Sequence, residues 1–259
     1  MSSTNPLTIQ KQRAGSGSPG KSTLYLIHDG SGTVANYTKL EKLEYDVYGI
    51  QDPKFMTSQP WTGGIVEMAR HYASLIQKTT PCGRIVLGGW SFGGLVAVQV
   101  AYELRNHQTL EVQGLILMEV IYPSVGQAED DGSAWPGLSA IRSFAVRDRV
   151  TKSVKQSGSM MNAWKPPRWD LAADSGSQEG KIPAVVLLRA KGQEVSENPH
   201  ALRFNALRKQ RFLGWEDYRS DFVTKLFDIE GSHLTLFEKE HIPSLTATMK
   251  VALEFLESR

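Results

Sequence analysis

The chain has 259 residues, enough for one large α/β domain or two small ones. Hydrophobic residues make up 41% and charged residues 22% of it, and the formal net charge of +2 gives no whole-molecule reason to expect nucleic-acid or membrane binding. Its single cysteine, Cys82, excludes an intramolecular disulfide and a cysteine-rich metal site. We therefore expect a globular protein of a reducing, cytoplasmic compartment.

The N-terminal segment lacks the apolar core of a signal peptide, and the chain contains no uninterrupted apolar run long enough for a membrane span. Residues 14–22 are rich in Gly, Ser and Pro, a composition typical of a flexible segment. The sequence therefore predicts a flexible lead-in over residues 1–22 and a single domain over residues 23–259.

The ordered part begins with an apolar strand at residues 24–27, which ends at the glycine-containing loop HDGSG, residues 28–32. A second strand follows at 45–50, and apolar residues from Ile65 to Ile76 have the spacing of an amphipathic helix. Further along, the pattern predicts strands at 84–87, 112–118, 182–188 and about 222–229, with helices at 95–106 and about 243–257. Strands that alternate with helices indicate an α/β fold with a mainly parallel central sheet and helices on both faces.

Residues 122–181 interrupt this alternation, because they contain no convincing strand. A long segment of this kind inside a compact domain indicates a helical insertion, such as a lid over a site. Its part from Arg142 to Arg168 is strongly basic. A charge run is ordinarily a solvated face, but this one would also suit an acidic partner, with Lys152 and Lys155 as candidate docking residues.

The stretch GGWSFGGL, residues 88–95, follows a predicted strand and precedes a predicted helix. In that context G-x-S-x-G is typical of a sharp elbow that presents a serine nucleophile, here Ser91, above a sheet. The tight turn requires glycines at 89 and 93. The backbone N–H of Phe92, at the start of the helix, would point to where an oxyanion forms.

A serine hydroxyl needs a base to take its proton, and the chain has six histidines. His233 stands in EGSH, between the last strand and the last helix, in a loop that would present its imidazole at the carboxyl edge of the sheet. His28 also ends a strand, but it precedes Ser91 and would reverse the nucleophile–acid–histidine order of this kind of site. The sequence therefore predicts His233 as the base.

A carboxylate should orient that imidazole. Glu119 follows the strand after Ser91 and is our candidate, although a polar residue at a strand end can also be ordinary. Glu194, after the next strand, is the alternative. The HDGSG loop would supply the second oxyanion donor, the N–H of Gly30, and the chain lacks both glycine-rich phosphate-binding patterns.

Several stretches together resemble the thioesterase domains of fungal polyketide synthases and the broader group of polyketide and peptide synthetase thioesterases: LYLIHDGSGTVANYTKL, YGIQDP, GGWSFGGLVAVQVAYEL, LILME, GWEDY and EGSHLTLF. The resemblance covers nearly the whole chain from about Thr8. It implies an α/β-hydrolase fold with a mobile lid, and it assigns the nucleophile to Ser91 and the base to His233. Such thioesterases usually have aspartate where Glu119 falls, so the longer glutamate would reach the histidine only with an adjusted backbone or rotamer.

The implied substrate is an acyl chain on the phosphopantetheine arm of an acyl carrier protein of a polyketide or hybrid synthase. Ser91 would take the chain as an ester, which hydrolysis, cyclisation or transfer then resolves, without a metal or bound cofactor. Five residues of the insertion would either line an acyl tunnel or only pack the lid: Trp135, Met160, Met161, Trp164 and Trp169. Two other functions remain open at this point, namely a serine esterase acting on free esters and a non-catalytic binding protein that retains a hydrolase fold.

Overall fold

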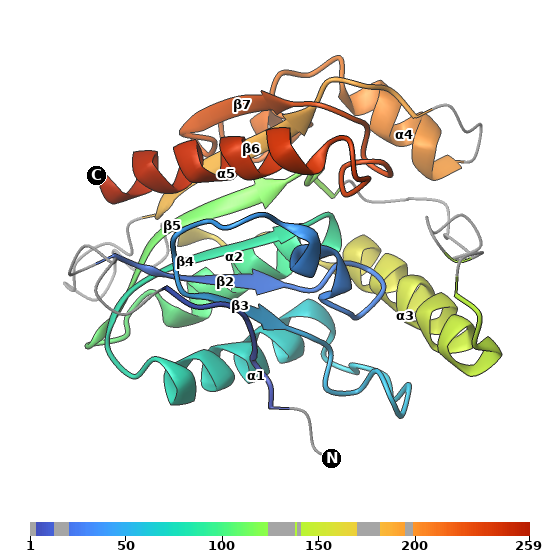
Figure 1. The fold of residues 1–259 in the computed structure, drawn as a ribbon, viewed down its shortest axis with the longest axis horizontal. Helices are drawn as coiled ribbons and strands as arrows, with labels where there is room; N and C mark the ends of the chain where they lie inside the picture. Colours follow the sequence, from blue (N-terminus) through green and yellow to red (C-terminus); the bar gives the residue numbers. More distant parts are fainter. Residues whose placement is uncertain (1–3, 13–20, 124–137, 139–140, 170–181, 195–198) are drawn as a thin grey trace.

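The structure is a computed structural model that describes residues 4–12, 21–123, 138, 141–169, 182–194 and 199–259 (Figure 1). In its described part, seven strands form one sheet in the order β1-β3-β2-β4-β5-β6-β7. Only the pairing of β1 with β3 is antiparallel, and every other neighbouring pair is parallel. The strands are β1 (Leu7–Gln10), β2 (Thr23–Ile27), β3 (Val47–Ile50), β4 (Gly83–Trp90), β5 (Leu110–Met118), β6 (Ala184–Ala190) and β7 (Lys225–Ile229).

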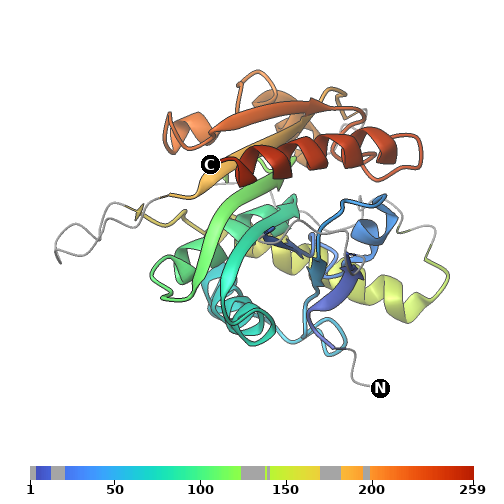
Figure 2. The ribbon, with the colours of Figure 1, turned by 60° about the vertical axis from the view of Figure 1, so that its left-hand side comes forward.

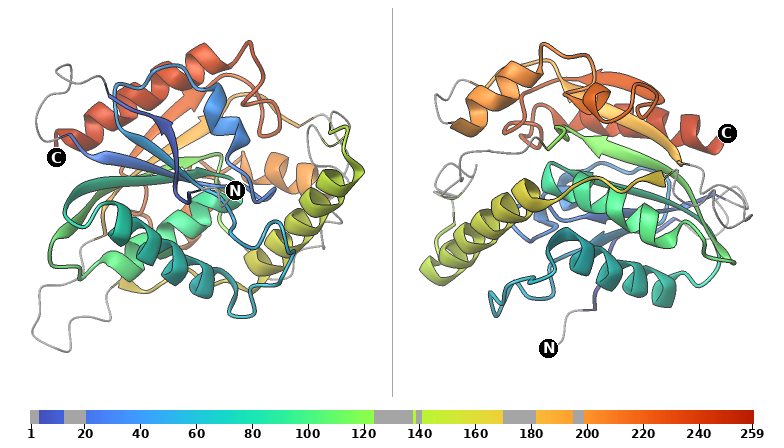
Figure 3. Two further views of the ribbon diagram at one scale, coloured as in Figure 1. Left: turned by 60° about the horizontal axis from the view of Figure 1, so that its bottom comes forward. Right: turned by 180° about the vertical axis from the view of Figure 1, so that it is seen from behind.

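Helices pack on both faces of this sheet, as Figures 1 and 3 show from opposite sides. One face is covered by α1 (Gly64–Thr79) and α2 (Phe92–Leu104), and the other by α5 (Ile242–Glu257) together with the short 3-10 helix η1 (Ala35–Lys39). Alternation along the strands divides the core accordingly. In β2, for example, Tyr25 and Ile27 belong to the cluster under α1 and α2, while Leu24 and Leu26 belong to the cluster under α5.

The predicted alternation of strands and helices is confirmed, with most boundaries shifted by one to three residues. β4 extends to Trp90, so the strand leads directly into the elbow at Ser91. Pro243 stands in the first turn of α5, where its missing N–H costs nothing. The strand β1 falls within the segment that we expected to be a flexible lead-in. Pairing along the edge of β3 orders these four residues, a tertiary effect that local composition does not reveal.

The expected insertion contributes α3 (Phe144–Ala163), a 20-residue helix that lies across the ends of α1 and α2 (Figure 3). Beyond the insertion, α4 (Pro199–Leu207) and the 3-10 helix η4 (Trp215–Asp217) connect β6 to β7 (Figure 2). No helix in the described part of the chain is long and apolar enough to cross a membrane.

Parallel pairing brings several strand ends to the same edge of the sheet. The last residues of β2 and β4 are neighbours, since Ile27 pairs with Gly89, and Trp90 pairs with Met118 at the end of β5. Ala190 likewise pairs with Ile229 at the ends of β6 and β7. The loops that follow these strands therefore gather at the carboxyl edge, where α/β sheets bind their ligands.

Candidate active site

Ser91 occupies a sharp turn between β4 and α2. Its backbone angles are φ 53° and ψ −122°, a conformation that L-residues rarely adopt and that costs about 1–3 kcal/mol. A Cβ on Gly93 would lie 2.4 Å from the carbonyl oxygen of Ile27, and one on Gly89 would lie 2.4 Å from the backbone of Gly93. Both glycines are therefore required, because the start of α2 lies too close to the ends of β2 and β4 for any side chain. Steric crowding thus explains why the motif has glycine at positions 89 and 93.

Phe92 is the first residue of α2, and the first four N–H groups of a helix have no intrahelical carbonyl to bind. Its buried ring lies 5.9 Å, centroid to centroid, from the imidazole of His28. The start of α2 thus lies beside the HDGSG loop, which contains Gly30. This juxtaposition is the one needed for two backbone donors to face a common oxygen atom.

Tyr37, in η1, links the two strands that lead into these loops. Its hydroxyl donates to the carbonyl of Ile27, at the end of β2, over 2.6 Å, and accepts a hydrogen bond from the N–H of Trp90, at the end of β4, over 2.9 Å. The side chain is almost fully buried. One hydroxyl therefore fixes the spacing between the segment before Gly30 and the segment before Ser91. The sequence analysis did not identify Tyr37, and a tyrosine in a short loop carries no signal of such a role.

His28, the first residue of the HDGSG loop, is buried, and both of its ring nitrogens have partners. Its Nδ1 lies 2.6 Å from the carbonyl oxygen of Asp29, which can only accept, so Nδ1 carries the proton. Nε2 then accepts a hydrogen bond from the hydroxyl of Tyr72, 2.7 Å away. Burial lowers the pKa of His28, so the ring stays neutral and both contacts persist. These contacts make His28 a support of the loop.

Asp29 follows in the same loop and is equally buried. Its Oδ1 accepts the N–H of Ser31 over 2.7 Å and its Oδ2 lies 3.4 Å from the amide nitrogen of Asn36. Burial raises the pKa of Asp29 to about 6, and the hydrogen bonds from Ser31 and Asn36 limit that rise. The loop is thus shaped by hydrogen bonds of its own side chains.

His233 and Glu119 lie together on the other side of the site. Glu119 directly follows β5, is 0% exposed, and has a φ of 49°, again unusual for an L-residue. Nδ1 of His233 lies 3.7 Å from Oε2 of Glu119, which is within ion-pair reach of a protonated imidazole but beyond ordinary hydrogen-bond length.

The imidazole of His233 is sandwiched between aromatic rings. It lies 5.4 Å from the ring of Trp90, the residue before Ser91, and 3.8 Å from the ring of Phe204 in α4, centroid to centroid. The side chain is 1% exposed. His233 therefore stands next to the elbow, as its place after β7 predicted, and its ring is confined by packing.

Glu194, the alternative acid, has a different set of contacts. Its Oε1 accepts the N–H of Leu234 over 3.0 Å, and its backbone exchanges hydrogen bonds with the side-chain amide of Asn205. The carboxylate thus binds the backbone directly after His233. The carboxylate of Glu119 is the one that forms an ion-pair contact with the imidazole nitrogen, at 3.7 Å.

An arginine that the sequence analysis overlooked binds the Glu119 carboxylate. Nη2 of Arg208 lies 2.7 Å from Oε2 of Glu119, and Nη1 donates to the carbonyl of Ala190. The N–H of Ala190 in turn donates to Oε1 of Glu119 over 2.5 Å. Arg208 follows α4 in a stretch with other cations, so nothing in the local sequence distinguishes it.

The tryptophans and methionines predicted for the insertion mostly anchor α3 and the segment after it. Nε1 of Trp164 donates to Oε1 of Gln99 in α2 over 2.9 Å, and Trp169 packs edge-to-face on Tyr102, also in α2. Met160 is buried in the same cluster and Met161 packs against it. These contacts support the packing alternative, while an acyl-lining role stays a prediction. Trp135 lies outside the described residues.

The basic side of α3 is exposed. Lys152 pairs with Asp148 one turn away, 2.7 Å between Nζ and Oδ2, and both side chains are largely in solvent. Lys155 is exposed as well. On its other side α3 touches the HDGSG loop, because Ser157 Oγ donates to the carbonyl of Gly30 over 3.3 Å. The helix therefore lies between the solvent and the predicted oxyanion loop.

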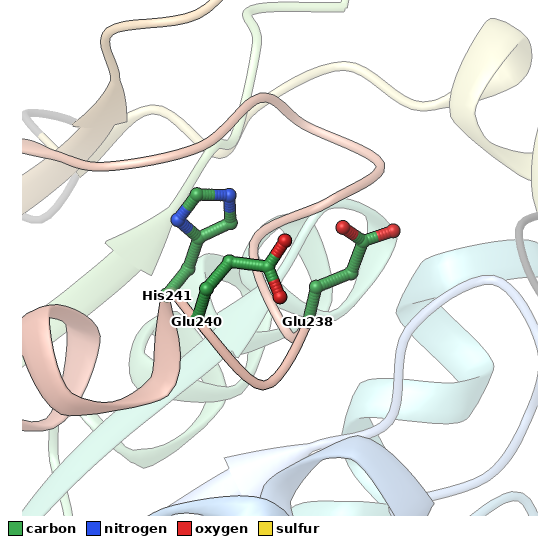
Figure 4. A group of neighbouring side chains, drawn as sticks. All are labelled: Glu238, Glu240 and His241. Carbon is green, nitrogen blue, oxygen red and sulfur yellow. The ribbon is translucent and has the colours of Figure 1, made fainter.

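Glu238, Glu240 and His241, shown in Figure 4, form the one cluster of potential metal ligands found among the described residues. Their ligand atoms lie within 4.8 Å of one another, but both carboxylates are exposed. They stand on the loop before α5. Exposed acidic groups often gather without a metal, so we assign none to them.

Comparison with known proteins shows the family of this chain. The model of the family described as Thioesterase domain matches residues 22–251. The protein named probable thioesterase gloN, from Glarea lozoyensis, is 31% identical over 97% of this chain and 98% of its own length.

Solved structures with the same fold include a thioesterase domain of NocB in covalent complex with a fluorophosphonate nocardicin G analogue. It superposes with a TM-score of 0.68 at 23% identity, over 90% of this chain and 95% of that one. A four-domain nonribosomal peptide synthetase, AB3403, matches with a TM-score of 0.67 at 17% identity, over 95% of this chain but only 20% of that one. The chain therefore belongs to the thioesterase family and is an enzyme with the α/β-hydrolase fold.

Proposed function

We propose that this thioesterase releases an acyl chain from the phosphopantetheine arm of a carrier protein through an ester formed on Ser91. One observation supports the proposal: in a member of the thioesterase family, the strained Ser91 directly follows Trp90, whose ring lies against that of the buried His233 beside Glu119. Strain at a polar residue next to a buried histidine is the arrangement that an activated nucleophile requires.

In the first step His233 takes the Ser91 hydroxyl proton while Oγ attacks the thioester carbonyl. The backbone N–H groups of Phe92 and Gly30 bind the resulting oxyanion. When the intermediate collapses, the C–S bond breaks, and the thiol leaves with the proton from His233. The acyl group then remains on Ser91 as an oxygen ester.

In the second step a nucleophile attacks the ester carbonyl and gives its proton to His233. Oγ of Ser91 leaves with that proton, which restores the enzyme. Water would give a free acid, whereas a hydroxyl or amine of the chain itself would give a ring. Glu119 keeps the imidazole oriented and stabilises its charge in both steps.

The carrier protein would dock on the basic side of α3. Exposed cations along this helix include Lys152 and Lys155, and Phe144 at its N-terminus is 81% exposed. An exposed aromatic side chain beside cations suits a partner that is acidic around an apolar patch. The likeness of this fold to one part of a peptide synthetase chain supports a partner from a polyketide or peptide synthase.

The test of the chemistry is to incubate the protein with an acyl-pantetheine thioester and with the oxygen ester of the same acyl group. We expect a mass gain equal to the acyl group on Ser91, faster reaction with the thioester, and no adduct in the Ser91→Ala variant. Absence of an adduct at Ser91 would reject the covalent route. A strong preference for the oxygen ester would instead indicate a general serine esterase.

The docking surface is tested by reversing charge in the pair Lys152→Glu and Lys155→Glu. We expect kcat/KM for the carrier-bound substrate to fall by about tenfold, while that for the free pantetheine thioester stays unchanged. The control reverses the exposed Lys42 and Lys78, which lie on other elements. Equal turnover of carrier-bound substrate by the two double variants would reject docking on α3.

A further inference from the structure

Arg208 is a buried cation that the mechanism above does not use. Its side chain is 8% exposed, and its guanidinium binds Oε2 of Glu119 and the carbonyl of Ala190. Oε2 is also the oxygen that lies nearest to Nδ1 of His233, at 3.7 Å. The guanidinium and the imidazole thus approach the same carboxylate oxygen, and the guanidinium is 1.0 Å closer (3.7 − 2.7 Å).

The carboxylate of Glu119 is held at both oxygens. Ala190 contributes its N–H to Oε1, and its carbonyl binds the same guanidinium that contacts Oε2. Glutamate has one more rotatable bond than aspartate, so its carboxylate samples more positions unless it is fixed. The planar fork of an arginine, anchored at a second acceptor, supplies such fixation where a lysine would not.

A stability role does not account for this pair. Replacing a buried ion pair by apolar side chains is often neutral or stabilising, because the desolvation penalty offsets the attraction. The position of the cation has a direct electrostatic consequence instead. It places a positive charge on the carboxylate that lies beside the imidazole of His233.

Two other ionisable groups that face the His233 loop in the described structure make different contacts. Glu194, after β6, binds the N–H of Leu234, and the ring of His241 packs on Gly231. β4 and α4 present the uncharged rings of Trp90 and Phe204. Within this set, Arg208 is the cation bound to the Glu119 carboxylate.

We propose that Arg208 is a positioning residue that fixes the Glu119 carboxylate beside His233 and sets the charge that the imidazole meets there. This inference rests on the proposed function, in which His233 acts as the base. The arginine thereby acts on the base through that carboxylate. Its fork contact also compensates for the extra methylene of the glutamate.

The experiment compares Arg208→Gln, which removes the charge, with Arg208→Lys, which keeps the charge but not the fork. Lys209→Gln is the matched control, because it makes the same charge change at the adjacent, exposed position. For each protein, kcat/KM on a pantetheine thioester is measured against pH. In parallel, the ring of His233 is titrated by NMR, with its signal assigned from a His233→Gln variant.

For Arg208→Gln we expect the acidic limb of the profile and the His233 titration midpoint to move to higher pH by about one unit. For Arg208→Lys we expect both to stay within about 0.3 unit of the wild type, while the plateau of kcat/KM falls by about tenfold. Lys209→Gln should match the wild type in every measurement.

An unshifted midpoint in Arg208→Gln, or an equal shift in Lys209→Gln, would overturn the electrostatic role of Arg208. A wild-type plateau in Arg208→Lys would overturn the positioning role, and this comparison decides the proposal even if the glutamine variant does not fold. The NMR titration needs no turnover. A protein that failed to cleave thioesters would therefore reject the proposed function and still give a readable result for Arg208.

Discussion

On the side of the site that we propose to bind the oxyanion, the oxyanion side, formed by the HDGSG loop and the elbow at Ser91, close backbone packing and hydrogen bonds fix the chain. A Cβ on Gly93 would collide with the carbonyl of Ile27, and the hydroxyl of Tyr37 bridges β2 and β4. On the base side, formed by the residues after β5, β6 and β7, contacts of buried charged side chains fix the chain. Glu119 binds Arg208, and Glu194 binds the backbone beside His233.

This difference has a physical basis in what each side must do. Donors for an oxyanion are backbone N–H groups, so their placement depends on backbone position, which steric packing sets accurately. A base that alternates between neutral and charged forms needs a nearby charge to tune it. The two sides should consequently respond differently to substitution.

The largest effect is expected from breaking the charged base side at Glu119. Glu119→Gln leaves Arg208 as an uncompensated buried charge, so the free energy of unfolding should fall by about 3 kcal/mol. It also removes the carboxylate beside His233, so kcat/KM should fall by about 10³-fold. Both are measured by denaturant unfolding and thioester turnover.

Glu194→Gln is the matched comparison, because it neutralises the other buried carboxylate near His233. Its amide oxygen can still accept the N–H of Leu234, so kcat/KM should stay within about tenfold of the wild type. If Glu194→Gln lost more activity than Glu119→Gln, the acid would be Glu194 and the interpretation of the base side would be wrong.

The next largest effect is expected from breaking the oxyanion side at Gly93. A Cβ at this position would lie 2.4 Å and 2.5 Å from the carbonyl oxygens of Ile27 and His28, which are backbone atoms of a central strand end. Gly93→Ala should therefore lower the free energy of unfolding by about 3 kcal/mol. Gly83→Ala is a control in open space, although its positive φ will cost up to about 1–2 kcal/mol. Equal losses in the two variants would show that close packing at Gly93 is not the cause.

The smallest effect is expected from Asp29, the buried carboxylate on the oxyanion side, and it tests how charge acts on that side. Burial raises its pKa to about 6, above the ordinary value in an unfolded chain, so the folded state binds more protons between pH 4 and 6. Its contribution to stability is therefore present at low pH and lost as pH rises through this range, by on the order of 2–3 kcal/mol.

Asp29→Asn has no such proton and keeps an oxygen for the N–H of Ser31. The free energy of unfolding of the variant minus that of the wild type should rise by this amount from pH 4 to pH 7. The difference cancels the contributions of other carboxylates and is measured by urea unfolding at several pH values. A difference that stays constant with pH would contradict the raised pKa.

Local sequence predicted the elements that depend on short-range pattern. Apolar spacing predicted α1. The glycines of GGWSFGGL predicted an elbow, because the residues that satisfy the steric demand of that turn are close together in the sequence. The order of strands placed Glu119 and His233 at the same edge, since parallel strands end together. The order of strands does not specify how close those two side chains come.

Only the tertiary structure decided the contacts between residues that are far apart in the chain. β1 is ordered by pairing with β3. Tyr37 accepts a hydrogen bond from the N–H of Trp90, which is 53 residues away in the chain. Arg208 is 89 residues away from its partner Glu119. A tyrosine or arginine has no local signature of such a role, because its partner is brought to it by packing of the whole sheet. The sequence by itself determined the fold class and where the candidate nucleophile, base and acid stand. Only the fold decided that a buried arginine shares the carboxylate of Glu119 with His233, since that depends on where the segment after α4 packs in space.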